Sequence, residues 1–277
     1  MNRKVNIISN VILFAVTIAT IVVSILLIRT YNSADTFLMV VLFIAGAVIA
    51  AFLCTVFHEL GHVFAAKKNG FQVTHVKIWF FLWTIRGKRK TFDFVLPGGE
   101  AGATETVPQT PENMPKRLKK LTLGGIYGSG VMLLLGAVFA SLYMFLPLTA
   151  YCILTAFLPV SAYFFFDSAL PMINGGLLND GGVLYGLRKK TDSLAVQCSV
   201  LRIQAEMFGG KTPAEVDQTL YFSVPQLPED DVNFYHLLNA RYNYYLDKED
   251  YENAKKVITR LYGLTEDMPT YIKNVVM

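Results

Sequence analysis

Residues 48–68 read VIAAFLCTVFHELGHVFAAKK. They end an apolar run that begins near residue 36 and is long enough to cross the roughly 30 Å hydrocarbon core of a bilayer. The run nevertheless contains two histidines and a glutamate in HELGH, and it ends with two lysines. Ionisable side chains at membrane depth are costly and are therefore usually functional. The stretch predicts a membrane-spanning helix with a polar site near one end.

The composition places the whole chain in the membrane class. Hydrophobic residues make up 53% of the 277 residues and charged residues 17%. The apolar residues gather in four stretches that are each long enough to span a bilayer. A net charge of +4 does not suggest a nucleic-acid partner, and the three cysteines show neither metal-ligand spacing nor a disulfide framework. The four stretches are about residues 7–28, 36–66, 121–146 and 148–166.

The lysines and arginines predict the orientation. They precede the first stretch, follow the second, precede the third and follow a Gly- and Asn-rich segment at about residues 168–187. The loops at 29–35 and around Pro147 are nearly uncharged. The positive-inside rule then puts both termini in the cytoplasm and HELGH near the cytoplasmic end of the second span. The first span is too long for a signal-peptide core and lacks a small-residue cleavage site, so we interpret it as a retained anchor.

Two regions outside the apolar stretches have a different character. Residues 71–107 are rich in β-branched and aromatic residues, and VTHVKIWFFLWTI and KTFDFVL predict the strands of a hairpin with RGKRK as its turn. Near the C-terminus, NFYHLLNARYNYYLDKEDYENAKKVITRLYGL predicts two amphipathic helices around a DKED turn. We therefore expect three parts: an anchor and loop at 1–35, a membrane-embedded core at 36–190, and a soluble helical domain at 191–277.

HELGH has the spacing of a zinc site. On a helix, residues four apart share a face, so His58 and His62 can both offer a ring nitrogen to one tetrahedral zinc ion. Glu59 then points beside the metal, where a general base for the attacking water must sit. Gly61 leaves space near the ion. A chance match is the competing interpretation, but the burial cost of three unused ionisable groups argues against it.

A catalytic zinc needs a third protein ligand. His75 lies in the strand-like region and His236 in the C-terminal part, and both are expected to be ordinary histidines. The anionic candidates at membrane depth are Asp167 and Asp180. Asp180 is favoured because the glycines that follow it allow close approach, although a helix N-cap would also explain it.

At this point the sequence resembles the site-2 protease family of intramembrane zinc metalloproteases. The resemblance covers roughly residues 40–187. It rests on HELGH in an early span, on LPGGEAGAT in the place of the family's Gly-rich membrane-associated β-hairpin, on the small-residue stretch GGIYGSG at 124–130, and on Asp180-Gly181 in a late span. It implies a mainly α fold: a polytopic membrane helix bundle with a short membrane-associated β-hairpin and a small soluble helical C-terminal domain.

The sequence departs from the family at its substrate-binding positions. The family usually has an Asn three residues before a Pro, whereas Ser168 stands three residues before Pro171 here. The Pro and Asn usual in the middle span are absent from GGIYGSG. We take Asn174 as a substitute, and Gly98 and Gly99 of the Gly-rich stretch as further substrate-binding residues.

The resemblance implies a zinc metalloendopeptidase that cleaves membrane-bound substrates, in regulated intramembrane proteolysis or peptide-signal processing, in a bacterial cell membrane. The expected partners are a membrane-spanning or membrane-associated peptide, the lipid bilayer, and a regulatory protein for the cytoplasmic C-terminal domain. The main alternative is an inactive relative that binds peptides as a chaperone. A prenyl-peptide-processing protease is disfavoured because the late spans lack a glutamate before Glu206, and a transporter because no internal repeat is found.

Overall fold

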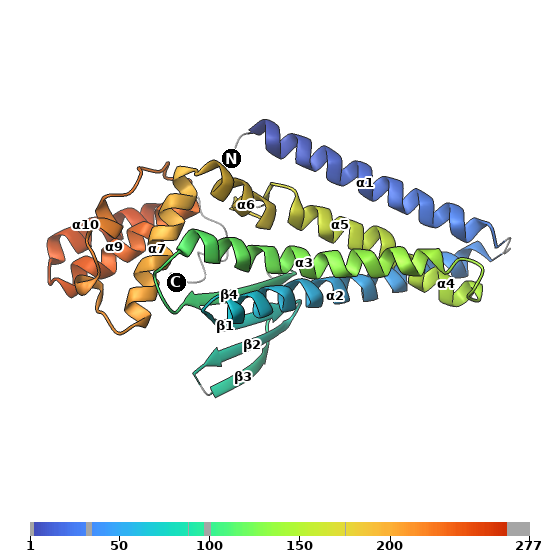
Figure 1. Cartoon of the computed structure of the whole chain (residues 1–277), viewed down its shortest axis with the longest axis horizontal. Helices are drawn as coiled ribbons and strands as arrows, with labels where there is room; N and C mark the ends of the chain where they lie inside the picture. The colour runs from blue at the N-terminus through green and yellow to red at the C-terminus, as the bar shows by residue number, and fades with distance from the viewer. Residues whose placement is uncertain (1–2, 32–34, 88, 97–100, 175, 265–277) are drawn as a thin grey trace.

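The computed structural model describes residues 3–31, 35–87, 89–96, 101–174 and 176–264. The chain is mainly helical, with long helices lying side by side along the long axis, a small sheet beside one of them, and a group of shorter helices at one end (Figure 1). Within the described residues, four helical segments are long and apolar enough to cross a membrane. They are α1 (Arg3–Arg29), α2 (Thr36–Lys68), α3 (Met114–Ser141) and the pair α4 (Leu148–Thr155) and α5 (Phe157–Ala169).

The four spans match the four predicted apolar stretches, which confirms that part of the prediction. Helix α3 begins earlier than the apolar run, because a proline near its first turn and the basic residues that follow also take helical conformation. Four such helices are the pattern of a multi-pass membrane protein.

The fourth span is broken between α4 and α5. Pro159 lies in the first turn of α5 and has no N–H to donate to the carbonyl of Thr155. The hydroxyl of Ser24, which is fully buried on α1, donates to that carbonyl at 3.3 Å. A contact from the first span therefore satisfies a backbone group that the proline leaves free, as a low-dielectric environment requires.

Between α2 and α3 the chain forms a four-stranded antiparallel sheet. Its strands lie in the order β3-β2-β1-β4, so β3 and β4 are its two edges. The strands are β1 (Phe71–Ile78), β2 (Phe81–Arg86), β3 (Arg89–Phe94) and β4 (Gly102–Pro108).

The expectation of a single hairpin over residues 71–107 is therefore wrong in the number of strands. VTHVKIWFFLWTI contains two strands joined at Trp79 and Phe80, and Trp79 takes a left-handed backbone conformation with φ of 55° to make that turn. GATETVP adds a fourth strand that pairs with β1. The Gly-rich stretch LPGGEAGAT, expected in the place of the family's β-hairpin, does not join the two strands of a hairpin either, because β3 before it and β4 after it are opposite edges of the sheet.

The Gly- and Asn-rich segment after α5 is short and folded. It forms a two-stranded ribbon, β5 (Ile173–Asn174) with β6 (Leu177–Leu178), and leads into α6 (Asp180–Lys189). The remaining helices form the group at the end of the molecule, where the two predicted amphipathic helices are found as α9 and α10 (Figure 1). These helices are α7 (Asp192–Phe208), the 3-10 helix η1 (Pro213–Glu215), α8 (Thr219–Phe222), α9 (Val232–Asp247) and α10 (Tyr251–Leu264).

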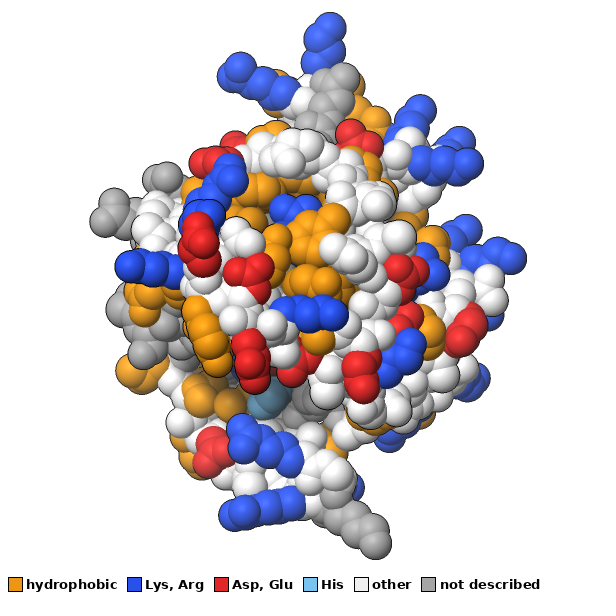
Figure 2. Space-filling view, turned by 90° about the vertical axis from the view of Figure 1, so that its left-hand side faces the viewer, with side chains coloured by type: hydrophobic (Ala, Val, Ile, Leu, Met, Phe, Trp, Pro, Cys, Tyr) orange, Lys and Arg blue, Asp and Glu red, His pale blue; other side chains and the backbone are white. Residues whose placement is uncertain are grey.

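The surface of this end differs from that of the long helices. Figure 2 looks onto it and shows acidic and basic side chains interspersed over the face, with small hydrophobic patches between them. A buried cluster of apolar residues from α7, α9 and α10 and the loop before α9 holds the helices together, including Val196, Phe234, Leu237 and Leu261. Charged side chains of both signs thus cover an apolar core at this end of the molecule (Figure 2).

Candidate metal centre and catalytic group

Helix α2 brings the two histidines of HELGH together. His58 and His62 are one turn apart, and their Nε2 atoms lie 3.2 Å from each other. The other ring nitrogen of each histidine contacts α3: Nδ1 of His58 lies 2.9 Å from the Ser129 hydroxyl, and Nδ1 of His62 lies 3.1 Å from the carbonyl oxygen of Leu121. A carbonyl can only accept, so Nδ1 of His62 carries the proton and Nε2 is left with a free lone pair.

Asp180, which lies much later in the chain, brings a carboxylate oxygen next to these two Nε2 atoms. It is the first residue of α6, and its Oδ2 lies 3.2 Å from Nε2 of His62 and 3.5 Å from Nε2 of His58. Oδ2 is buried, and among the described residues it accepts no hydrogen bond. Because buried carboxylate oxygens are almost always partnered, this oxygen requires a positive group beside it, which a proton on one of the two histidines or a metal ion would supply.

The loop before Asp180 is fixed by Asn179 and Gly181. The Asn179 side chain caps α6 by accepting from the Gly182 N–H at 2.8 Å, and its amide donates to the carbonyl of Leu170 at 2.8 Å. Asn179, and not Asp180, is therefore the N-cap. A Cβ on Gly181 would lie 2.4 Å from the Leu170 carbonyl oxygen, so only glycine lets α6 approach the end of α5 this closely.

The three converging atoms fit a zinc ion. A tetrahedral ion with ligand bonds of about 2.0–2.1 Å has its ligand atoms roughly 3.3–3.4 Å apart. The separations here are 3.2, 3.2 and 3.5 Å. Two imidazole lone pairs and a carboxylate oxygen repel one another at this distance unless a cation lies between them. Among the described residues, these three form the group able to hold a metal ion.

Gly125 on α3 keeps this space open. A Cβ added there would lie 2.3 Å from Nε2 of His62 and 2.7 Å from Oδ2 of Asp180. The glycines around it bring α2 and α3 together: a Cβ on Gly61 would meet the Gly124 carbonyl oxygen at 2.1 Å, and one on Gly128 would meet that of Phe57 at the same distance. Small residues commonly permit such close crossings of membrane helices.

Glu59 lies beside the three atoms and is only 4% exposed. Its Oε2 accepts a hydrogen bond of 2.6 Å from the Thr104 hydroxyl on β4. Its Oε1 lies against the same strand, where a Cβ on Gly102 would come within 2.5 Å of it. The edge strand β4 thus holds the carboxylate in place, and Gly102 leaves room for it.

The other predicted residues lie elsewhere. Asp167 is outside the three-residue group, and its Oδ1 accepts a hydrogen bond of 3.3 Å from the exposed side chain of Asn174. Gly98 and Gly99 lie outside the described residues. Nδ1 of His75 lies 3.0 Å from Oε2 of Glu105. His236 lies on α9.

Four residues that position the site escaped the sequence reasoning: Thr104, Ser129, Gly102 and Gly125. The available signal was GGIYGSG, in which Gly125 and Ser129 are four residues apart and so share a helix face. That pattern indicates a close helix contact, but it does not say which helix makes the contact.

The fold and site together define a membrane protein with a histidine–histidine–carboxylate cluster between its spans. The chain matches the family model described as Peptidase family M50 over residues 46–276, and it belongs to this family, the site-2 protease family of intramembrane metalloproteases. The resemblance seen in the sequence is thereby confirmed. No curated protein and no solved structure matches the chain.

Proposed function

We propose that the protein is a zinc metalloendopeptidase that hydrolyses peptide bonds of membrane-bound substrates, with His58, His62 and Asp180 as the metal ligands and Glu59 as the general base. The observation that carries the proposal is the buried Oδ2 of Asp180, which accepts no hydrogen bond from the described residues and lies 3.2 and 3.5 Å from two imidazole nitrogens. Three protein ligands leave a fourth position open, which is the arrangement of catalytic zinc sites.

Zinc bound there would act as a Lewis acid that polarises the scissile carbonyl and makes a water more acidic. Glu59 takes the proton from the attacking water while its Oε2 is held by the Thr104 hydroxyl. It then hands this proton to the leaving amine, so the same carboxylate serves as base and acid. Burial of Glu59 excludes competing water from this proton transfer.

The substrate must be extended where it is cut, because a helix keeps its carbonyls hydrogen-bonded. We propose that the edge strand β4 receives this extended segment by strand addition. Support comes from the position of β4: it pairs with β1 along one side, and its Thr104 contacts the general base. Gly98 and Gly99, just before β4 in sequence, remain candidates for the same role, as does Asn174, whose side chain donates to Asp167.

The bilayer is the second expected partner. Strands β2 and β3 pair Phe81 with Phe94 and Trp83 with Phe92 on one face, and the same two strands end in the pair Arg86 and Arg89. Phe94 is 72% exposed. Aromatic rings next to basic residues are typical of a membrane–water interface, so we propose that this hairpin lies in the leaflet.

The orientation of the chain in the membrane is proposed from the positions of its lysines and arginines. Helices α2 and α6 end, and α3 begins, with lysines and arginines near the C-terminal helices. The positive-inside rule favours this end as cytoplasmic. From the family resemblance we also propose that the membrane is a bacterial cell membrane and that a regulatory protein binds the C-terminal helices.

The decisive experiment measures zinc in detergent-purified protein beside Asp180→Ala and Asp167→Ala variants. We expect about one zinc per chain, lost with Asp180→Ala and kept with Asp167→Ala. Cleavage of a synthetic membrane-spanning peptide should stop on chelation, return with zinc, and be absent in Glu59→Gln with zinc content unchanged. Peptide binding with zinc but no cleavage by the wild type would favour the inactive, chaperone-like relative. A folded wild type that takes up no zinc would refute the metalloprotease.

A further inference from the structure

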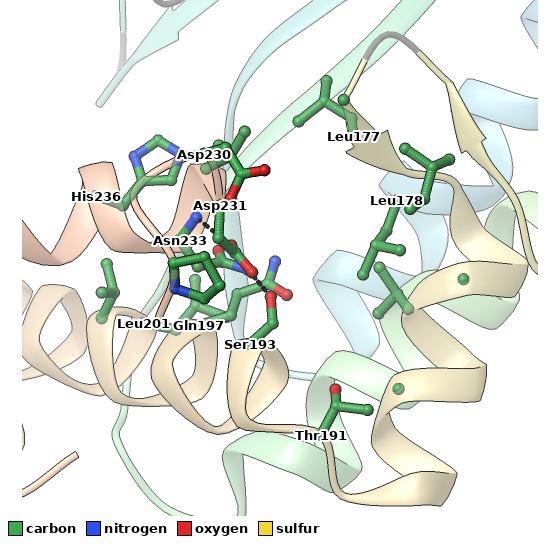
Figure 3. A pocket seen from close by; sticks show the side chains of 18 of the residues that line it. Leu177, Leu178, Thr191, Ser193, Gln197, Leu201, Asp230, Asp231, Asn233 and His236 are labelled. Carbon is green, nitrogen blue, oxygen red and sulfur yellow. Dashed lines mark hydrogen bonds between the residues drawn. The ribbon is translucent and has the colours of Figure 1, made fainter. Parts of the chain in front are cut away.

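A cavity of about 560 Å³ lies between the segment that carries Asp180 and the C-terminal helices. Figure 3 shows Leu177 and Leu178 of the β5–β6 ribbon on one side of it, and side chains of α7 and α9 on the other. Helix α6 also contributes to the wall, through Gly182 and Val183. A cavity of this size can enclose several side chains of a bound molecule.

The two sides of the cavity have different chemistry. The side nearest the membrane core is apolar, whereas the far side carries Asp230, Asp231 and neutral polar groups (Figure 3). None of the described residues that line the cavity is a lysine or an arginine. Burial lowers the pKa of His236 below its usual value, so this ring adds no positive charge at neutral pH. The cavity is therefore acidic on one side and apolar on the other.

The cavity is close to the metal ligands along the chain. Leu178 precedes Asp180 by two residues, and Gly182 follows it by two. An extended chain covers about 3.3–3.6 Å per residue, so a peptide whose scissile bond lies at Asp180 reaches the cavity within a few residues.

We propose that this cavity is an exosite, a second binding site that holds the basic and apolar flank of a membrane-spanning substrate next to its scissile bond. This proposal rests on the proposed function. The cytoplasmic flanks of membrane spans are rich in lysine and arginine, and such a flank matches a cavity with two carboxylates and no cations. Apolar residues between the basic residues of such a flank match the cavity wall formed by Leu177 and Leu178. The exosite selects substrates by the charge of their flank.

The two carboxylates can be neutralised without disturbing the fold. Asp231 caps α9 by accepting from the Asn233 N–H at 2.9 Å, and asparagine caps helices equally well. Asp230 is exposed. The variant Asp230→Asn/Asp231→Asn therefore removes two charges and should melt within about 2 °C of its parent. A matched control, Asp217→Asn/Glu252→Gln, removes two charges from positions that do not line the cavity.

The experiment measures binding of two fluorescent peptides to the zinc-loaded full chain carrying Glu59→Gln, in nanodiscs of zwitterionic lipid. The peptides share one apolar span and differ in the flank, Lys-Leu-Arg-Lys-Leu or Gln-Leu-Gln-Gln-Leu. We expect the basic flank to bind about tenfold more tightly, and the Asp230→Asn/Asp231→Asn change to weaken it about 3- to 10-fold, in line with modest gains per partly exposed charge pair. Filling the cavity with Gln197→Trp should also weaken it.

Equal affinity for the two peptides, or a preference that survives both the double change and Gln197→Trp, overturns the exosite. A loss of the preference in the control variant as well would assign it to the overall charge of the domain, and would also overturn the proposal. A second experiment with chains that keep Glu59 distinguishes a failure of the exosite proposal from a failure of the protease proposal. If they hold zinc and cleave both peptides equally, the exosite alone fails; if they hold no zinc and cleave neither, the protease proposal fails.

Discussion

Gly125→Ala tests whether the space between the two histidines and Asp180 is a metal site. The added Cβ would lie 2.3 Å from Nε2 of His62, whereas ordinary contacts begin near 3.4 Å, so the ring must move by about 1.1 Å. Helix α3 cannot retreat, because Gly124 and Gly128 hold its backbone against α2. A zinc ligand tolerates displacements of about 0.2 Å. We therefore expect a loss of at least about 100-fold in zinc affinity, or about 2.7 kcal/mol.

The assay is a zinc titration of the purified protein against a chromophoric chelator, with circular dichroism to verify the helical content. Gly130→Ala is the matched control, since it makes the same chemical change on the same helix. Its Cβ would meet Phe165 at 3.5 Å, an ordinary contact, and alanine favours the helix by up to about 1 kcal/mol. Gly130→Ala should keep wild-type zinc affinity. Wild-type affinity in Gly125→Ala would refute the assignment of this space to a metal.

Three further changes separate the roles of neighbouring polar groups. Ser129→Ala removes the partner of Nδ1 of His58 and should weaken zinc binding about 10- to 100-fold. Ser129→Thr keeps a hydroxyl, so recovery of zinc binding in that variant would show that the hydroxyl orients the ring. Thr104→Val removes the hydroxyl that holds Glu59 and should lower the rate of peptide cleavage about tenfold or more at unchanged zinc content; lost zinc would contradict this. Ser24→Ala leaves a buried carbonyl unpartnered and should cost about 1–3 kcal/mol of stability, measured as a lower melting temperature in detergent, and an unchanged melt would contradict the contact.

The spans and the last two helices could be predicted because their signals are local. A long apolar run and a period of 3.6 are visible within one segment, whatever it packs against. The sheet was harder. VTHVKIWFFLWTI has no Gly, Pro or Asn to mark a turn, so the reversal at Trp79 gives no signal. The strand GATETVP is polar and short, and its pairing with β1 spans more than 20 residues of chain.

The residues of the site likewise divide into those with a local sequence signal and those without one. His58 and His62 follow from a spacing of four on one helix, and Asp180 from the shortage of other carboxylates at membrane depth. The structure brings these three together, and their role as ligands stays a prediction until metal is measured. Ser129 and Gly125 could not be assigned, because their roles depend on where α3 crosses α2. Such a crossing is fixed by the packing of distant segments and leaves no local pattern.

The hydrogen bond from Ser24 to the Thr155 carbonyl also sets the earliest time during synthesis at which α1 can pack against the fourth span. Its two residues are 131 positions apart, which a ribosome making about 5–20 residues per second covers in roughly 7 to 26 s. Helix α1 must wait in the bilayer for that time without its final neighbour. Helix α1 can be stable alone in the bilayer. The hydroxyls of Thr17 and Thr20 donate to carbonyls of their own helix, and most of its apolar side chains face outward. Helix α1 is thus made before α4 and α5, the helices that it contacts, and packs against them only when they are complete.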